Sequence, residues 1–205
     1  MIVTLDGPAA SGKGTLARRL AEHLQVPHLD TGLLYRSVAE RVLAGGRSPD
    51  DVEAASAAAR NIDLAGLDRD RLSRAGLGEA ASRVAAIPEV RAALLKLQQD
   101  FARRPGGAVL DGRDTGTVIA PEAEVKIFVT ATPEARAARR HRELALRGEN
   151  LTYDQVLADI RRRDERDSGR STAPLKPAPD AVLLDTTDLD IEAAFREVLK
   201  LVRRA

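Results

Sequence analysis

Short apolar runs alternate with longer amphipathic stretches along this chain. The runs predict five short β-strands, which lie at residues 2–5, 27–30, 108–111, 125–131 and 181–185. Between them, apolar side chains recur at helical spacing, as in Leu16, Leu20 and Leu24, and again along residues 191–203. Strands separated by helices favour a parallel sheet that is covered on both faces, which is an α/β fold.

A parallel sheet of this kind binds its ligands beyond the carboxyl ends of its strands. The residues that follow the first predicted strand read GPAASGKGT. The two outer glycines allow a tight backbone curl, in which successive N–H groups point inward at phosphate oxygens. A helix that begins at Lys13 adds the positive end of its dipole, and the lysine reaches the β- and γ-phosphates. We therefore predict that ATP binds at this phosphate loop, which comprises Gly7, Pro8, Ala9, Ala10, Ser11, Gly12, Lys13, Gly14 and Thr15.

The residue after Lys13 departs from the general pattern of such loops. Gly14 stands where a Ser or Thr normally binds Mg²⁺, and Thr15 lies roughly 100° further round the helix. We therefore expect no direct side-chain ligand, and expect phosphates and water to hold the metal. Asp111 ends the third predicted strand and is a candidate partner for the metal through water; the alternative is a turn-forming residue.

Composition limits the class of protein. The chain has 205 residues, 43% of them hydrophobic and 31% charged, which fits one soluble globular domain. It contains no cysteine, which excludes disulfides and cysteine-ligated metals, and its three histidines make a structural zinc site unexpected. No apolar run is long enough to span a membrane, the first residues form no signal peptide, and the net charge of +1 attracts neither nucleic acid nor membranes. We expect a cytoplasmic protein.

Three further polar segments carry specific patterns. Residues 30–36 read DTGLLYR, residues 111–117 read DGRDTGT, and residues 161–170 read RRRDERDSGR. Together with the phosphate loop, these segments resemble those of bacterial cytidylate kinases, in that family's order, from residue 1 to about residue 185. Phosphate loops occur in many enzymes, so the other three segments carry most of the resemblance.

The resemblance implies a P-loop fold with three α/β/α layers and a five-stranded parallel sheet. It implies a single kinase domain with a core of residues 1–36, 93–147 and 173–205, an acceptor-binding insert of about 37–92 and a mobile lid of about 148–172. The implied reaction is direct in-line transfer of the γ-phosphoryl group of ATP to CMP or dCMP with Mg²⁺, giving ADP and CDP or dCDP. The implied partners are these small nucleotides, taken up by a monomer that binds neither nucleic acid nor membranes.

The resemblance also assigns charged residues to the transferred phosphate. The implied catalytic residues, which neutralise the charge that phosphoryl transfer concentrates, are Lys13, Arg113, Arg163 and Arg170. Arg36 and Arg113 are placed on the acceptor's phosphate, whose oxygens suit bidentate guanidinium groups. Arg163 and Asp167, one helical turn apart, are placed on its ribose and phosphate. For Arg36 the alternative is a salt bridge on a helix surface, and for the lid arginines it is a solvated helix with i,i+4 ion pairs.

Base recognition has its own implied set of residues. Cytosine presents an amino donor at N4 beside acceptors at N3 and O2, so a selective pocket needs a carboxylate or hydroxyl next to a cationic donor. Ser82, Arg91 and Asp114 occupy the family's positions for this, and Thr31 presents a hydroxyl to the ribose or base. A mismatch of buried hydrogen bonds is worth roughly 10⁴-fold in discrimination. The alternatives are an ordinary helix residue for Ser82 and an exposed helix arginine for Arg91.

The expected insert looks short for the family. Residues 37–81 read as alanine-rich helix followed by a weak polar stretch, 61–74, with few strand signals, whereas longer family members carry a small sheet here. The alternative enzyme is another small-molecule kinase of the same fold, of the adenylate or shikimate type, but an adenylate kinase would lack the GRDxGT pattern. A guanine-nucleotide switch needs an NKxD segment, which the chain lacks. A non-catalytic nucleotide-binding regulator is the last alternative, and the intact Lys13, Asp114 and lid arginines argue against it.

Overall fold

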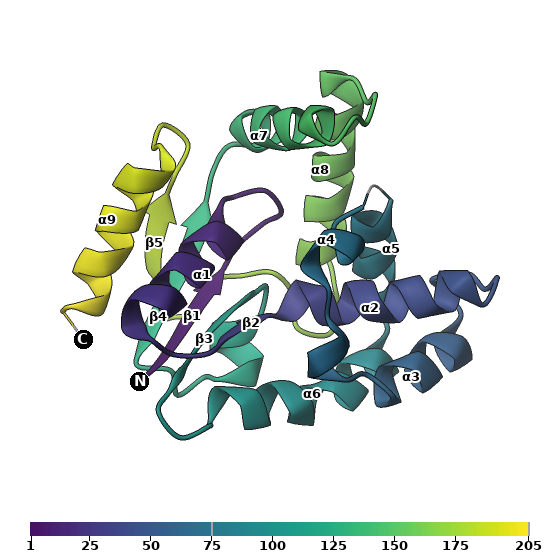
Figure 1. The fold of residues 1–205 in the computed structure, drawn as a ribbon, viewed down its shortest axis with the longest axis horizontal. Coiled ribbons are helices and arrows are strands. Elements are labelled where there is room, and N and C mark those ends of the chain that lie inside the picture. The colour runs from purple at the N-terminus through teal and green to yellow at the C-terminus, as the bar shows by residue number, and fades with distance from the viewer. Residues whose placement is uncertain (75, 205) are drawn as a thin grey trace. The chain divides into compact units, whose positions relative to one another are not determined.

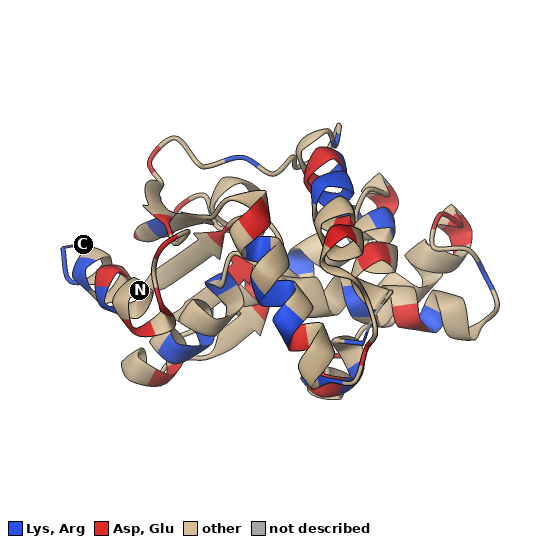
Figure 2. Ribbon diagram, turned by 90° about the horizontal axis from the view of Figure 1, so that it is seen from above, with Lys and Arg blue, Asp and Glu red and all other residues tan. Residues whose placement is uncertain are grey.

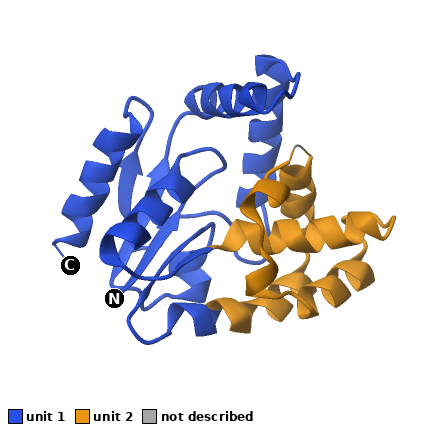
Figure 3. Ribbon diagram, viewed as in Figure 1, with its two compact units in different colours: residues 1–29, 99–205 blue, residues 30–98 orange. Residues whose placement is uncertain are grey.

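The computed structural model describes residues 1–74 and 76–204, so residue 75 of the expected insert and residue 205 of the expected core lie outside the description. Within it the chain divides into two compact units, which Figure 3 colours separately. Unit 1 comprises Met1–Leu29 and Gln99–Ala205, and unit 2 is the continuous stretch Asp30–Gln98. Unit 2 contains the stretch expected to bind the acceptor and extends a few residues beyond it at each end.

Unit 1 is built on a five-stranded sheet with the strand order β2-β3-β1-β4-β5 (Figure 1). The strands are β1 (Ile2–Asp6), β2 (His28–Asp30), β3 (Ala108–Gly112), β4 (Val125–Thr130) and β5 (Val182–Asp185). β1 pairs in parallel with β3 and with β4, and β4 pairs in parallel with β5. The five predicted strands and the α/β class are therefore confirmed, with a difference of one residue at one end of each strand.

The helices of unit 1 are α1 (Lys13–Leu24), α7 (Pro133–Leu146), α8 (Tyr153–Ser168) and α9 (Ile191–Val202), and a π-helical turn, η2 (Thr115–Ile119), follows β3. α1 and α9 pack against each other and against the sheet. Their leucines, valines and alanines join the apolar side chains of β1, β3 and β4 in one buried core. α7 and α8 pack together around a smaller apolar cluster. The phosphate loop leaves the centre of the sheet, because β1 is the middle strand.

Unit 2 is helical. Its elements are α2 (Thr31–Ala44), α3 (Val52–Arg60), the 3₁₀ turn η1 (Leu64–Gly66), α4 (Arg69–Leu72), α5 (Leu77–Val84) and α6 (Pro88–Ala102), which runs on into unit 1. α2 packs against α3, α4 and α5 and supplies much of the buried apolar surface. Apart from Asp30 at the end of β2, the described residues of unit 2 contain no strand, as the weak strand signals of this region predict.

Two features of the sheet were not evident from the sequence. Lys126, the one charged residue in the β4 run, is buried, because its ammonium group binds the Asp180 carboxylate at 2.7 Å and the Pro121 carbonyl. β5 lies at the edge of the sheet, where the Leu183 side chain is 64% exposed. Elsewhere acidic and basic residues are interspersed along the helices (Figure 2). Among the described residues, no helix has both the length and the apolar character needed to cross a membrane.

Candidate active site

The phosphate loop has the backbone of a tight curl. Gly7 and Gly12 adopt φ angles of 152° and 90°, and Ala10 is held in the left-handed region with φ 59°. A Cβ atom placed on Gly7 would lie 2.0 Å from the carbonyl oxygen of Val129, so the loop is seated directly on β4. The conformation therefore depends on a residue without a side chain at this position.

The loop also has the donors that an anionic ligand requires. α1 begins at Gly12 without a side-chain cap, so the positive end of its dipole faces the loop. The buried Lys13 folds back over the loop, and its ammonium group donates to the Pro8 carbonyl at 3.3 Å. The Ser11 hydroxyl is buried and has no hydrogen-bond partner in the part of the chain that the structure describes. These features fit the polyphosphate of a nucleotide.

Asp6, the last residue of β1, organises the segment after β3. Its carboxylate accepts hydrogen bonds from the Thr115 N–H at 2.9 Å, the Thr115 hydroxyl at 2.8 Å and the Gly116 N–H at 2.8 Å. Burial raises the pKa of Asp6 to about 6, although the two N–H donors oppose this, and the neighbouring Asp114 charge adds to it. Asp6 thereby fixes the start of η2, directly after the predicted base-reading residue Asp114.

The candidate magnesium partner Asp111 lies within β3 and is buried. Its Oδ1 is 2.7 Å from Nε2 of His28 on β2, which orients the carboxylate. The carboxylate therefore lies near the carboxyl ends of β1 and β3, where the phosphate loop begins, since Asp111 and Leu5 are partners in the β1–β3 register. A buried, oriented carboxylate at this edge fits a role in holding water around Mg²⁺.

The lid arginines meet at one buried carboxylate. Asp167 on α8 is 1% exposed and binds Arg113 at 2.9 Å, Arg163 at 3.7 Å and Arg170. Burial alone would raise the pKa of Asp167, but the charges of these three arginines and the hydrogen bond from Arg113 hold it well below its ordinary value. We call Arg113, Arg163, Arg170 and Asp167 the arginine cluster; it joins the segment after β3 to the lid.

The other face of α8 is exposed, as the alternative of a solvated helix expects, but its ion pairs are not at i,i+4 spacing. Arg161 and Arg162 have exposed side chains that pair with Glu134 on α7 and Asp159 on α8, respectively. Arg163 and Asp167, by contrast, lie on the buried side. α8 therefore separates charges that interact with water from charges that are held inside unit 1.

The predicted acceptor residues of unit 2 lie on three helices. Thr31 and Ser82 are buried, at the start of α2 and within α5. Arg36 on α2 donates to the Leu72 carbonyl at 3.5 Å and the Ser73 hydroxyl at 3.4 Å, not to a surface carboxylate in these contacts.

Arg91, on α6, is buried rather than exposed, so the exposed-arginine alternative is wrong. It donates to the Ala85 carbonyl at 3.3 Å, and its guanidinium lies 5.5 Å from the ring centroid of the buried Tyr35. Burial of an arginine against an aromatic ring fixes its orientation.

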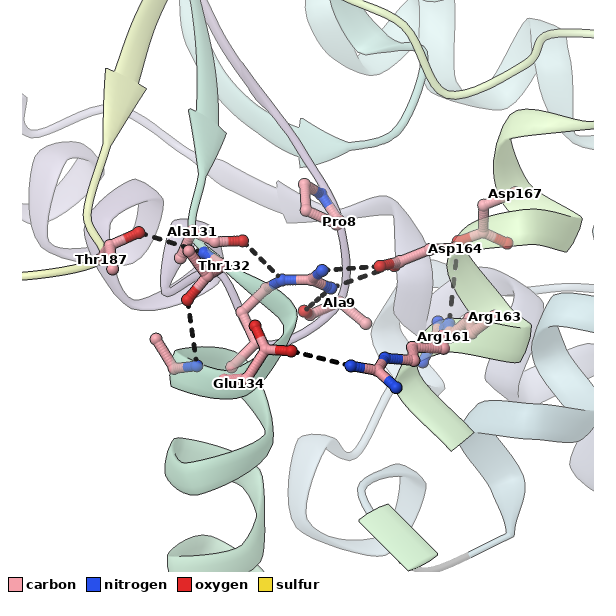
Figure 4. Close-up of polar contacts among 12 residues, drawn as sticks. Pro8, Ala9, Ala131, Thr132, Glu134, Arg161, Arg163, Asp164, Asp167 and Thr187 are labelled. Carbon is pink, nitrogen blue, oxygen red and sulfur yellow. Dashed lines mark hydrogen bonds and ion pairs between the residues drawn. The ribbon is translucent and has the colours of Figure 1, made fainter. Parts of the chain in front are cut away.

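The structure thus brings the arginine cluster together within unit 1, and it places Asp114 in unit 1 but Ser82 and Arg91 in unit 2. Sequence reasoning missed Asp6, Arg136 and Asp164. Asp6 directly follows an apolar run, which is a signal that was available. Arg136 is one among many charged helix residues, and no local pattern distinguishes it. Asp164 lies within the segment 161–170 noted above, but nothing in that segment marks it as the partner of Arg136. Figure 4 shows the contacts around Asp164.

Comparison with known proteins gives concordant results. A sequence model described as cytidylate kinase matches residues 3–204. A cytidylate kinase from Methylocella silvestris is 62% identical over 205 residues, covering all of this chain and 95% of that protein. One from Xanthobacter autotrophicus is 64% identical over 208 residues, covering all of this chain and 99% of that protein. In fold, the chain is similar to an uncharacterized protein from Eubacterium ventriosum, with a TM-score of 0.58 and 15% identity over 100% of this chain and 99% of that one.

Proposed function

Because the chain belongs to the cytidylate kinase family, we propose that it transfers the γ-phosphoryl group of ATP to CMP or dCMP, giving ADP and CDP or dCDP. The observation that supports this most directly is the arginine cluster, which gathers three guanidinium groups on the lid and the segment after β3. Phosphoryl transfer needs such a concentration of positive charge around the moving group.

The phosphate loop is the proposed site of ATP. Its N–H groups and the start of α1 face the β- and γ-phosphates, and Lys13 adds a point charge. Mg²⁺ neutralises phosphate charge when bound, and Asp111 is the residue that we propose to hold it through water. The Ser11 hydroxyl is an additional donor for a phosphate oxygen.

The acceptor's phosphate is assigned to Arg36 of unit 2 and to the arginine cluster of unit 1. Asp167 keeps three guanidinium groups close to one another although their like charges repel. Folding therefore brings these charges together before a phosphate binds. The site is preorganised for phosphoryl transfer. Asp167 also presents an acceptor to a ribose hydroxyl.

Base recognition is assigned to Ser82, Arg91 and Asp114, with Thr31 facing the ribose or base. A carboxylate accepts from the N4 amino group of cytosine, while the guanidinium of Arg91 donates to N3 and O2. Uracil would present a carbonyl to the carboxylate and an N–H to the arginine, which leaves buried polar groups mismatched.

Residues 148–172 are the proposed lid. Its closure would exclude water, so that ATP is transferred to the acceptor and not hydrolysed. Gly148, with φ 76°, and Gly169, which ends α8, are the proposed hinges. We further propose a monomer in the cytoplasm whose partners are nucleotides alone.

The test is a coupled ADP-release assay with ATP and Mg²⁺ against CMP, dCMP, UMP, AMP and shikimate, with Lys13→Ala as the negative control. Turnover largely confined to CMP and dCMP is the expected result. Equal use of UMP or AMP would remove the base-reading assignments. Binding of ATP without turnover of any acceptor would replace the enzyme with a regulator.

A further inference from the structure

Arg136, on the first turn of α7, is a buried arginine that the proposed reaction does not use. It is 3% exposed. Its Nε donates to the Ala131 carbonyl at 2.9 Å, Nη1 donates to the Ala9 carbonyl at 3.3 Å, and both Nη atoms bind the Asp164 carboxylate, at 3.0 and 2.6 Å. A guanidinium group has five N–H bonds, and these contacts engage most of them. One side chain therefore joins the residue after β4, the phosphate loop and α8.

The position of Arg136 is fixed by its own part of the chain. α7 begins at Pro133 behind an N-cap at Thr132, whose hydroxyl accepts from the Ala135 N–H at 3.3 Å. The Thr132 N–H in turn donates to the Thr187 hydroxyl at 3.1 Å (Figure 4). The bond from Nε to Ala131 then aims the remaining N–H groups outward from β4. The guanidinium of Arg136 is therefore held in one orientation, in which it binds both the phosphate loop and α8.

On the loop side, Arg136 holds one peptide group. The Ala9 carbonyl that it binds belongs to the peptide before Ala10, whose φ of 59° lies in the left-handed region. That conformation is strained for an alanine. Because the C=O and N–H of a trans peptide point in opposite directions, holding the Ala9 carbonyl also sets the direction of the Ala10 N–H. This N–H belongs to the phosphate loop, whose N–H groups are the proposed donors to the phosphates of ATP.

On the lid side, Arg136 holds α8 by Asp164. Asp164 is three residues before Asp167, so the two carboxylates are neighbours on the helix. Asp164 binds Arg136 on α7, and Asp167 binds the three arginines of the arginine cluster. The place of Arg163 relative to the phosphate loop therefore depends on the Arg136–Asp164 ion pair, because Arg163 and Asp164 both lie on α8. Arg170 follows the end of α8 and is tied to the helix by its ion pair with Asp167.

We propose that Arg136 is a positioning residue that couples the conformation of the phosphate loop to the placement of the lid arginines, acting through Ala9 on one side and Asp164 on the other. Loss of the pair with Asp164 frees the guanidinium to move and leaves a buried positive charge without its counter-ion, and the Ala9 peptide loosens with it. The role in catalysis rests on the proposed kinase function, whereas the coupling itself is a property of unit 1.

The test compares Asp164→Asn with Glu134→Gln. The second variant is a matched control, because Glu134 and Arg161 form another ion pair between α7 and α8, at 2.8 Å, but on the surface, with side chains 55% and 59% exposed. Hydrogen–deuterium exchange is measured on the protein without nucleotide. Asp164→Asn is expected to speed exchange about tenfold or more in the peptide that covers residues 7–15, on a different element from the substitution, and Glu134→Gln to leave it unchanged.

Steady-state kinetics with ATP and CMP supply the second readout. Asp164→Asn is expected to lower kcat about 10–100-fold while each KM stays within about threefold, since misplacement of charged groups by about 1 Å costs this much. Asp164→Glu, which keeps the charge, is expected to recover most of the loss. Unchanged exchange in residues 7–15 together with kcat within about twofold of wild type overturns the proposal.

Two outcomes need separate treatment. If Asp164→Asn fails to fold, Arg136→Lys serves in its place, because an ammonium group keeps the charge but cannot bind Ala9, Ala131 and Asp164 together. Loss of loop protection in this variant supports the proposal, and full protection overturns it. If wild-type protein does not phosphorylate CMP, the proposed function fails, and the exchange experiment still decides the coupling.

Discussion

The surroundings of the Asp6 carboxylate shift its pKa in opposite directions. Three donors from Thr115 and Gly116 stabilise its ionised form, yet burial and the nearby Asp114 charge outweigh them. The gap between the ordinary pKa of 3.8 and about 6 corresponds to about 3 kcal/mol. Because the folded pKa is the higher one, the folded state binds more protons between these values. The stability that Asp6 contributes is complete below about pH 4 and is lost as the pH rises through about 6.

This reasoning gives the first prediction. In protein labelled with ¹³C at aspartate carboxyls, we expect the Asp6 signal to titrate near pH 6, whereas Asp167 stays ionised throughout the range in which the protein is folded. The measurement is an NMR titration from pH 4 to pH 8, with assignments from Asp6→Asn and Asp167→Asn. An Asp6 midpoint below about 4.5 would show that the three hydrogen bonds outweigh burial.

At the residue scale, the charged residues that could carry chemistry were predictable from the sequence, whereas their burial was not. Three predicted arginines meet at Asp167, and Lys13 lies on the phosphate loop, but the burial of Arg91 and Lys126 did not follow from their neighbours in the chain. Each is buried because a partner distant in sequence, such as Tyr35 or Asp180, covers it. For the same reason Arg136 carried no signal, because its partners Ala9 and Asp164 lie on other elements.

The phosphate loop provides a prediction at the scale of an element. Gly7→Ala would bring a methyl group against the Val129 carbonyl, which belongs to β4 and cannot move without distorting the sheet. We expect this variant to lose more than about 4 kcal/mol of unfolding free energy. Gly46→Ala is the matched control, since Gly46 also has positive φ, 69°, but open space around it.

Gly46→Ala is expected to cost only about 1–2 kcal/mol, the usual penalty for a left-handed alanine. Urea denaturation measures both values. Equal losses of unfolding free energy in the two variants would mean that Gly7 is required for its positive φ, and not for the close contact of the loop with β4.

The lid helix α8 depends on its buried carboxylate. Asp167→Asn leaves Arg113, Arg163 and Arg170 without the charge that holds them together, which we expect to cost about 3 kcal/mol and to lower the melting temperature by about 5–10 °C. The depressed pKa of Asp167 means that wild-type protein has this stability above about pH 4 and loses it as the pH falls further.

Thermal melts in low and high concentrations of inorganic phosphate test this. An added anion should bind the three arginines and restore part of the loss in Asp167→Asn. Asp159→Asn, which removes an exposed partner of Arg162 on the same helix, is the control and should melt within about 2 °C of wild type. A melting temperature for Asp167→Asn equal to that of the control would contradict the role of the cluster.

The strands were predictable as elements because each is an apolar run between turn-forming residues, and their ends differ from the prediction by at most one residue. The order of the strands in the sheet was not predictable. The apolar run that forms β5 resembles the run that forms β4, although β5 is an outermost strand of the sheet. The π-helical η2 was also missed. Its conformation is set by Asp6, which is 109 residues away in sequence from Thr115.

At the scale of the whole molecule, the residues proposed to read the base are divided between the two units. Asp114 belongs to unit 1, and Ser82 and Arg91 belong to unit 2. We expect Asp114→Ala to lower the ratio of kcat/KM for CMP to that for UMP about 100-fold or more, since the cytosine amino group loses its acceptor. Glu122→Gln, an exposed carboxylate paired with Arg103, is the control. An unchanged ratio for Asp114→Ala would end its assignment as a base reader.

The central place of β1 in the sheet has a consequence for how the protein is made. β1 leaves the ribosome before the other strands, yet Val3 pairs in register with Val109 of β3 and Val125 of β4. At about 5–20 residues per second, the nascent chain carries this apolar segment without its partners for on the order of ten seconds. Residues 30–98 are translated entirely within that interval. The phosphate loop is synthesised before β3 and β4, so it can pack against Val129 only after that residue has emerged. Slow or interrupted translation before that point exposes an apolar strand that can aggregate.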